Sequence, residues 1–167
     1  MKKFEMTSEF ITNVLGTKLF RIKALIEFGD VSAGELGGYI EKEENLAQDG
    51  NAWVYGNAKV YGDAKVCGDA KVYGNAEVCG NAEVYGNADY STVKGFGRIF
   101  RTTTFFRTKD KAIGVNCGCF YGTLEEFRDK VRETHGDSKT AKEYLMLADL
   151  MEYKFSREMD VEEEVNQ

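Results

Sequence analysis

The sequence predicts a mainly β protein built around a short parallel β-solenoid, because glycine returns at every sixth position through residues 50–90. Glycine stands at positions 50, 56, 62, 68, 74, 80 and 86, and each is followed by Asn or Asp and then Ala. Valine stands two positions after that alanine in six of the seven hexapeptides, and the chain has 18 glycines but no proline. A strict period of six fits neither a helix nor a single strand, so it indicates one turn used repeatedly.

Each hexapeptide combines a short strand with a corner. Alternation along a strand places Ala58 and Val60 on one side and Lys59 on the other. The Gly-Asn or Gly-Asp step adopts positive φ at low cost and can therefore turn the chain. Equal strands and equal corners wind into a coil with an Ala and Val interior, and successive coils lie about 4.8 Å apart.

The outward charges indicate three hexapeptides per coil. With three per coil, Lys59 lies opposite Glu77 and Lys65 lies opposite Glu83, whereas two per coil would place Lys59 on Lys71. Opposite charges directly across neighbouring strands stabilise a sheet by about 0.2–1 kcal/mol, and like charges destabilise it. The charge pattern therefore favours a three-sided coil over a two-sided one.

The repeated Val-Tyr-Gly-Asn-Ala-Lys unit resembles the hexapeptide repeat of left-handed parallel β-helix proteins over residues 50–90. This resemblance implies a left-handed coil, a homotrimer, and a superfamily that includes many acyltransferases. The stretch from Leu19 to Tyr61, together with the TTTFFRT and CGCFYGTLEEF segments, also resembles uncharacterised phage and prophage proteins with variable numbers of these repeats. The second resemblance implies no established reaction.

Residues 1–49 are expected to form an N-terminal cap, because a stack of repeats needs covered ends. Apolar residues at every second position predict a strand with one apolar face: Phe20, Ile22, Ala24, Ile26 and Phe28. Ile40 and Leu46 are separated by the length of one hexapeptide, in the frame of the later alanines, and predict an irregular first coil. Residues 1–16 are predicted as a frayed helix.

After the solenoid of residues 50–94, residues 95–155 predict a small ββαα unit. Two strands are expected at 98–107 and 112–121, and the second has an alternating face of Ile113, Val115, Cys117, Cys119 and Tyr121. Thr123 and Glu126 form a capping-box pattern before a helix that His135-Gly136 would end, and a second helix follows from about Ser138. Residues 156–167 are acidic and predict a solvated tail.

Charge and composition exclude several classes of function. A net charge of −6 argues against general nucleic-acid binding, and no apolar run approaches the length of a membrane span. The opening Met-Lys-Lys lacks the apolar segment of a signal peptide. We therefore expect a cytoplasmic protein without membrane contact, located in the host cytoplasm if it is phage-encoded, with its four cysteines as thiols.

The basic strand and turn at residues 98–111 carry five basic side chains against one acid. Alternation places Arg101, Thr103 and Arg107 on one strand face, and Lys109 follows in the turn. Arginines beside a hydroxyl suit a phosphate or carboxylate, so these residues predict a binding site for a host protein or an anionic, nucleotide-like ligand. The alternative is that the arginines pair with acidic residues of the next helix or of the tail.

Aromatic residues that point outward from the solenoid predict a self-association surface: Trp53, Tyr55, Tyr61, Tyr73 and Tyr85. A short coil also leaves exposed strand edges at its ends, which favours a homo-oligomer. Alternatively, these side chains cover the corners of an isolated solenoid.

The cysteines and the single histidine indicate no metal or cofactor. Cys117 and Cys119 are expected to pack in the core, because zinc usually takes four ligands, although a metal or redox role stays open. Cys67 and Cys79 stand two hexapeptides apart and fall on different sides of a three-sided coil, which argues against a disulfide. His135, the only histidine, lies outside the repeats, and no catalytic residue is predicted.

These features favour a non-enzymatic, oligomeric binding or scaffold protein. The solenoid has no histidine to act as a general base, and its uninterrupted hexapeptides leave no extruded loop to close an acyl-donor site. The phage resemblance implies counter-defence, either by blocking a host protein or by sequestering a nucleotide-like signal. One alternative is an acetyl-CoA-dependent hexapeptide acyltransferase, and another is a structural phage component.

Overall fold

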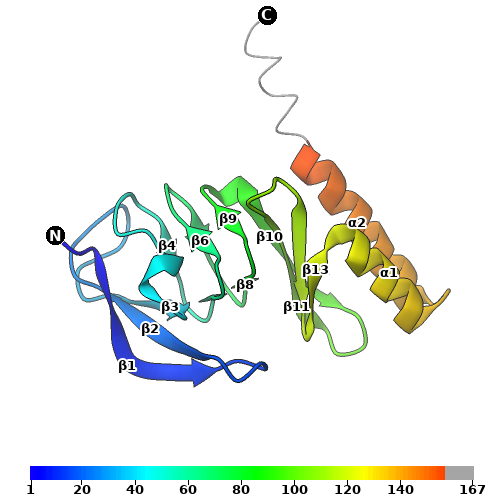
Figure 1. The fold of residues 1–167 in the computed structure, drawn as a ribbon, viewed down its shortest axis with the longest axis horizontal. Helices are drawn as coiled ribbons and strands as arrows, with labels where there is room; N and C mark the ends of the chain where they lie inside the picture. Colours follow the sequence, from blue (N-terminus) through cyan, green and yellow to red (C-terminus); the bar gives the residue numbers. More distant parts are fainter. Residues whose placement is uncertain (157–167) are drawn as a thin grey trace, which may run out of the picture.

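The computed structural model describes residues 1–156, a mainly β structure with two helices at its C-terminal end (Figure 1). Along the chain lie an antiparallel cap, a series of short parallel strands, and an antiparallel sheet with two helices. The predicted acidic tail lies outside the described residues, except for Ser156, which ends the last helix. No helix within residues 1–156 combines the length and the apolar character needed to cross a membrane.

The hexapeptides form six short strands, which pair in parallel. They are β4 (Trp53–Val54), β5 (Lys59–Val60), β6 (Lys65–Val66), β7 (Lys71–Val72), β8 (Glu77–Val78) and β9 (Glu83–Val84). Strand β4 pairs with β7, β5 with β8 and β6 with β9, so that Lys59 lies opposite Glu77 and Lys65 opposite Glu83. Each strand thus pairs with the third one after it, in the register that the charges predict. The alanines and valines of the first six hexapeptides fill the interior and are fully buried.

Glycine is required at the corners, as Gly68 illustrates. Its φ is +63°, and a Cβ there would lie 2.6 Å from the carbonyl oxygen of Tyr85 in the next coil. Only a residue without a side chain can adopt this backbone conformation at that distance without strain. The seventh glycine, Gly86, has an extended backbone and precedes the short 3-10 helix η2 (Asn87–Asp89), where the coil ends.

The cap consists of β1 (Phe4–Thr12), β2 (Lys18–Ala24) and β3 (Leu36–Ile40) in one antiparallel order. The helix predicted for residues 1–16 is therefore wrong, because most of that segment pairs along β2. The alternation predicted for β2 is also only partly correct. Leu19 and Ile22 are fully buried and Phe20 is not, because the register shifts between Arg21 and Lys23.

The irregular first coil is present, but its predicted frame is wrong, because Ile40 and Leu46 stack on valines and not on alanines. Ile40 pairs with Val60 and Leu46 with Val66, so this coil is slightly longer than the regular coils that follow it. The 3-10 helix η1 (Glu43–Asn45) lies between the two paired positions, and the buried Asn45 amide donates to the carbonyls of Gly62 and Ala64.

The C-terminal sheet has four antiparallel strands: β10 (Tyr90–Phe96), β11 (Arg101–Arg107), β12 (Ile113–Cys117) and β13 (Phe120–Thr123). The structure therefore has four strands here, where the sequence predicts two. The proposed boundary at residues 94 and 95 falls inside β10, and a tight turn at Gly118-Cys119 divides the predicted strand 112–121 in two. Tyr121 consequently leaves the predicted face and stacks on Phe106, with ring centroids 6.4 Å apart.

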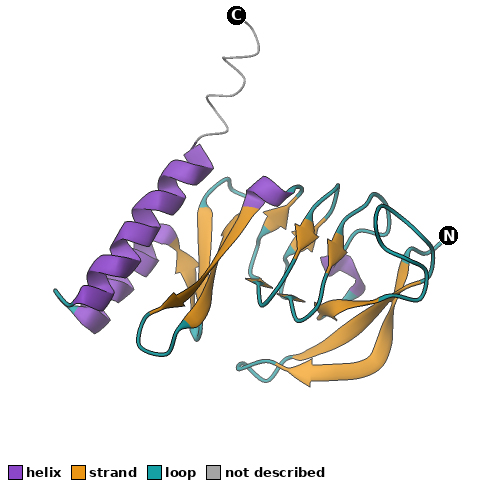
Figure 2. Ribbon diagram, turned by 180° about the vertical axis from the view of Figure 1, so that it is seen from behind, coloured by secondary structure: helices purple, strands orange, loops and turns teal. Residues whose placement is uncertain are grey.

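Helices α1 (Leu124–His135) and α2 (Lys139–Ser156) lie together on the face of this sheet that points away from the solenoid (Figure 2). The capping box at Thr123 and Glu126 and the end of α1 at His135-Gly136 are as predicted. Two neighbouring residues of β11 point into two different hydrophobic cores. Phe105 packs with the helices, whereas Phe106 packs into the core of the solenoid and cap. We call residues 90–156 the sheet–helix unit.

Candidate functional site

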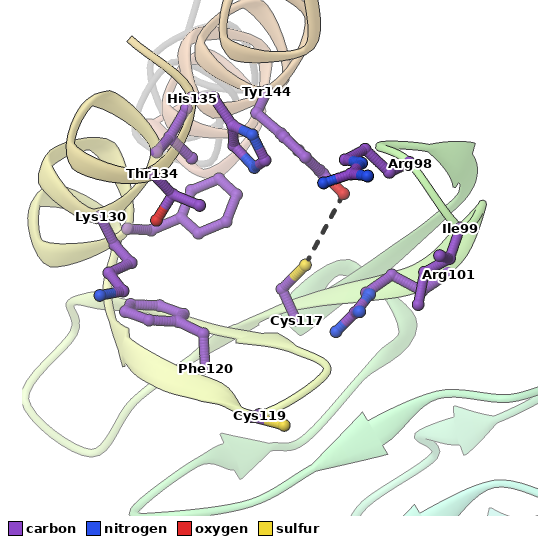
Figure 3. Close-up of a pocket in the computed structure, with 12 residues that line it drawn as sticks. Arg98, Ile99, Arg101, Cys117, Cys119, Phe120, Lys130, Thr134, His135 and Tyr144 are labelled. Atoms are coloured by element: carbon purple, nitrogen blue, oxygen red, sulfur yellow. Dashed lines mark hydrogen bonds between the residues drawn. The ribbon is translucent and has the colours of Figure 1, made fainter.

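The site with the most varied chemistry is a cavity of about 560 Å³ at one end of the sheet–helix unit (Figure 3). We call it the end cavity. It opens where the β10–β11 turn, the β12–β13 turn and the C-terminal end of α1 meet. Its lining consists of Arg98, Ile99, Arg101, Cys117, Cys119, Phe120, Phe127, Lys130, Val131, Thr134, His135 and Tyr144.

The mouth of the end cavity is cationic. Arg98, Arg101 and Lys130 line it, and no aspartate or glutamate within the described residues does. Within residues 1–156, the side chains of Arg98 and Arg101 form no hydrogen bond or ion pair, whereas Lys130 pairs with Glu133 at 3.0 Å. Two arginines without a carboxylate partner in this part of the chain are suited to an anionic ligand, although the whole chain has a net charge of −6.

Arg101 is held against the β12–β13 turn. The backbone of Gly118 has a φ of +63°, and a Cβ at that position would overlap the guanidinium of Arg101. Glycine therefore serves two purposes here, because it permits the tight turn and leaves room for the arginine. The cation lies beside the residue that follows Cys117.

Cys117 forms the middle of the polar wall. The buried Thr103 hydroxyl donates to its sulfur at 3.2 Å, and the sulfur lies 4.0 Å from the hydroxyl of Tyr144. The Tyr144 hydroxyl also donates to the Phe96 carbonyl at 3.3 Å. Burial, with a smaller contribution from Cys117, raises the pKa of Tyr144 to about 12, so this phenol stays protonated at neutral pH.

The apolar side of the cavity is aromatic. Phe127 contacts Phe120 and Tyr144, with ring centroids 5.6 and 5.7 Å apart. The imidazole of His135 stacks on Tyr144 with a centroid distance of 6.1 Å. The end cavity thus combines an apolar wall, a thiol, a phenol, an imidazole and cations.

The residues predicted as one anion site lie in different places. Arg101 lines the end cavity, Thr103 is buried beside Cys117, and Lys109 lines a separate hollow over the solenoid. Arg107 lies at the other end of β11, 3.5 Å from the Asp89 carboxylate, and it donates to the Phe155 carbonyl at 3.0 Å. Arg101, Thr103 and Arg107 share a strand face, but the length of the strand separates the two arginines, and Lys109 lies beyond the end of the strand. Whether each binds a ligand remains a prediction.

The predicted self-association surface is also divided. Trp53 is fully buried because Phe4 and Phe28 of the cap pack on it, at ring distances of 6.3 and 5.4 Å. Tyr61 is buried because the sheet–helix unit covers it, and its hydroxyl accepts from the Asn116 amide at 3.2 Å. The prediction that Trp53 and Tyr61 belong to an outward self-association surface is therefore wrong.

The remaining members of that surface lie on the outside. Tyr55 stacks on Tyr73 at a centroid distance of 4.4 Å, and Tyr73 and Tyr85 are exposed by 46% and 56%. Self-association through these three residues stays a prediction.

All four cysteines are free thiols. Cys119 does not share a buried strand face with Cys117, since it lies in the turn and is exposed. No group of three or more metal-ligating side chains occurs in the part of the chain that the structure describes.

The end cavity itself does not follow from the sequence. The sequence identifies His135 only as a helix end and Cys117 only as a core residue, and the two lie far apart along the chain. Two features of the sequence could indicate the cavity, the glycine after Cys117 and the arginines that follow Gly97. Neither shows that the two turns meet in space.

No protein-family model matches this chain. A protein of Escherichia coli (strain K12) named "Uncharacterized acetyltransferase YdcK" is 42% identical over 62 residues, which are 33% of this chain and 19% of that protein. The chain thus spans about a fifth of the length of this relative. The similarity agrees with the resemblance to hexapeptide-repeat proteins and gives no support to the phage resemblance. It contradicts the expected non-enzymatic scaffold role and favours the acyltransferase alternative instead.

Proposed function

We propose that this chain carries an acyltransferase site that takes its acyl group from acetyl-CoA or a related acyl-CoA. The observation that carries the proposal is the end cavity, in which two arginines without a carboxylate partner among residues 1–156 stand beside an apolar wall. The similarity to a protein named acetyltransferase supports this class of reaction.

An acyl-CoA has the two chemical halves that the cavity would accommodate. Its phosphates suit Arg98 and Arg101, because guanidinium groups bind phosphate oxygens in a bidentate manner. The methyl and methylene groups of its pantetheine arm suit the apolar side chains of Phe120, Phe127 and Val131. The acyl end would then point toward Cys117 and His135.

His135 is the candidate general base. Imidazole can accept a proton from an attacking amine or hydroxyl at neutral pH. Its stacking on Tyr144 holds the ring at the cavity wall. This assignment proposes a general base on the sheet–helix unit, whereas the sequence predicts no catalytic residue.

We further infer that the solenoid is a left-handed β-helix and that the outward tyrosines Tyr55, Tyr73 and Tyr85 join copies of the chain. The support is the parallel pairing of each hexapeptide strand with the third one after it, together with the resemblance of the repeat. A crystal structure with a right-handed coil, or a monomer by native mass spectrometry, would contradict these two inferences.

Calorimetry with acetyl-CoA tests the proposed function. The Arg98→Glu/Arg101→Glu variant should bind at least about tenfold more weakly, because a charge-assisted hydrogen bond contributes about 1.5–3 kcal/mol. Arg132→Glu is the matched control, since Arg132 lies on the same helix as His135, is exposed, and does not line the cavity. His135→Gln should bind acetyl-CoA normally and lose the repeated release of free CoA in the presence of an acceptor amine. No binding of acetyl-CoA, or equal binding by the double variant, would overturn the proposal.

A further inference from the structure

We propose that the Cys117 thiol is the first acceptor of the acyl group and carries it as a thioester before transfer to the final acceptor. This inference rests on the proposed function, because it requires an acyl-CoA in the end cavity. It adds a covalent intermediate and a nucleophile to that function.

The position of Cys117 supports a reactive role over a packing role. Its sulfur borders the end cavity and is only partly buried, on the same wall as Arg98 and Arg101 (Figure 3). Cys79, by contrast, is buried, and burial raises the pKa of its thiol. A thiolate is the nucleophilic form of cysteine, and nearby cations stabilise it.

Two groups can stabilise negative charge on this sulfur. Thr103 already donates its hydroxyl to the sulfur at 3.2 Å. The guanidinium of Arg101 packs against the adjacent Gly118. The Tyr144 hydroxyl has a different part, because it accepts from the thiol at 4.0 Å and donates its own proton to the Phe96 carbonyl. Thr103 is buried, so the core fixes its side chain, and a donor held this way needs little reorganisation during reaction.

Cys119 provides an internal comparison. It stands just beyond Gly118 and also borders the cavity, yet it is exposed and no hydrogen bond to its sulfur occurs within residues 1–156. In Figure 3 Cys119 lies apart from the space between Arg101 and Tyr144. The geometry therefore distinguishes two thiols of nearly equal sequence position.

The chemistry is thioester exchange. The Cys117 thiolate attacks the carbonyl carbon of the acyl-CoA, a new carbon–sulfur bond forms, and the bond to the CoA sulfur breaks. The CoA leaves as a thiolate and takes the proton that Cys117 has lost. An amine or hydroxyl then attacks the Cys117 thioester, and its proton passes to His135 while the Cys117 thiolate leaves. No oxidant or reductant is needed.

Intact-mass spectrometry of the full chain after incubation with acetyl-CoA tests the inference. We expect the mass of one acetyl group per chain, mapped to Cys117 and removed by hydroxylamine, which cleaves thioesters. Cys117→Ala should lose this adduct and Cys119→Ala should keep it. Thr103→Val should slow its formation at least tenfold, whereas acetylation of the unfolded chain should show no preference for Cys117.

Calorimetry distinguishes a failure of the covalent step from a failure of the proposed acyltransferase function. If acetyl-CoA binds and the adduct is absent, or lies on Cys119, the covalent step is overturned and the proposed acyltransferase survives. If acetyl-CoA does not bind, both are overturned. The wild-type mapping does not depend on any variant, so a folding defect in Thr103→Val would not rescue the inference.

Discussion

In the regular coils of the solenoid, each alanine and valine of the interior stacks on the same residue type in the neighbouring coil, whereas the sheet–helix unit buries a mixture of aromatic, aliphatic and polar side chains. The solenoid interior is alanine and valine, and its coils differ mainly in their outward residues. The sheet–helix unit buries Phe105, Phe127 and Tyr144 together with Thr103 and the largely buried Arg128. Arg128 joins the two helices through Asp149 at 2.9 Å and Glu152 at 2.7 Å.

This difference explains why the candidate site lies outside the repeats. A stack of near-identical coils provides small apolar side chains in its interior and few polar groups that could contact a ligand. The irregular unit brings turns from distant positions together and leaves space between them. The regular solenoid therefore supports the irregular sheet–helix unit, and the cavity forms in the latter.

The largest effect should come from the residue that joins the two regions. Phe106→Ala removes a fully buried ring from the solenoid side and should cost about 3–5 kcal/mol of unfolding free energy, as should Phe105→Ala on the helix side. Hydrogen exchange should separate them: Phe106→Ala should reduce protection in β8 and β9 as well as in the sheet. If solenoid protection is unchanged, the two regions are uncoupled.

The next effect compares two corners of the solenoid. Gly68 and Gly74 have φ of +63° and +67°, but only at Gly68 would a Cβ meet the next coil. Gly74→Ala should cost about 1–2 kcal/mol through backbone strain, and Gly68→Ala roughly 1–3 kcal/mol more through the steric conflict. Urea unfolding measures both. Equal losses would show that the coils separate easily.

A pH-dependent effect is expected at the cap. Lys3 donates to the carbonyls of Asp49 and Ala52, and its burial lowers its pKa to about 8 from 10.5. Between these values the unfolded chain binds the proton and the folded chain releases it. The contribution of Lys3 to the unfolding free energy should therefore rise with pH, by at most about 1.4 kcal/mol per pH unit.

Lys3→Met should remove this rise between pH 8 and 10.5. Lys2→Met is the control, because Lys2 is exposed and pairs with Glu43 at the surface. Chemical unfolding at several pH values measures the slope. An unchanged slope in Lys3→Met would show that another group carries the dependence.

The smallest effect concerns the register of the solenoid. Lys59 and Glu77 form an ion pair of 2.8 Å across parallel strands and are only about a quarter exposed. Glu77→Lys should cost about 0.2–1 kcal/mol, because it places like charges opposite each other. The exchanged pair Lys59→Glu/Glu77→Lys should regain part of the loss in urea unfolding. A double variant less stable than Glu77→Lys would contradict this account of the register.

The sequence by itself determined the spacing of the coils, the corner glycines, the capping box of α1 and the limits of the two helices. These features depend on contacts that are local or that repeat at a fixed interval, so a one-dimensional pattern contains them. It did not determine that residues 4–12 form a strand, since that strand exists only through its pairing with β2.

Only the tertiary structure decided which outward residues are covered and which side chains meet. Trp53 has the pattern of a surface residue, but the cap buries it. Cys117 and His135 come together because two turns and a helix end converge, and nothing in the spacing of the chain encodes that meeting. Contacts between non-repeating, distant segments depend on how whole elements pack, and packing is a property of the folded molecule.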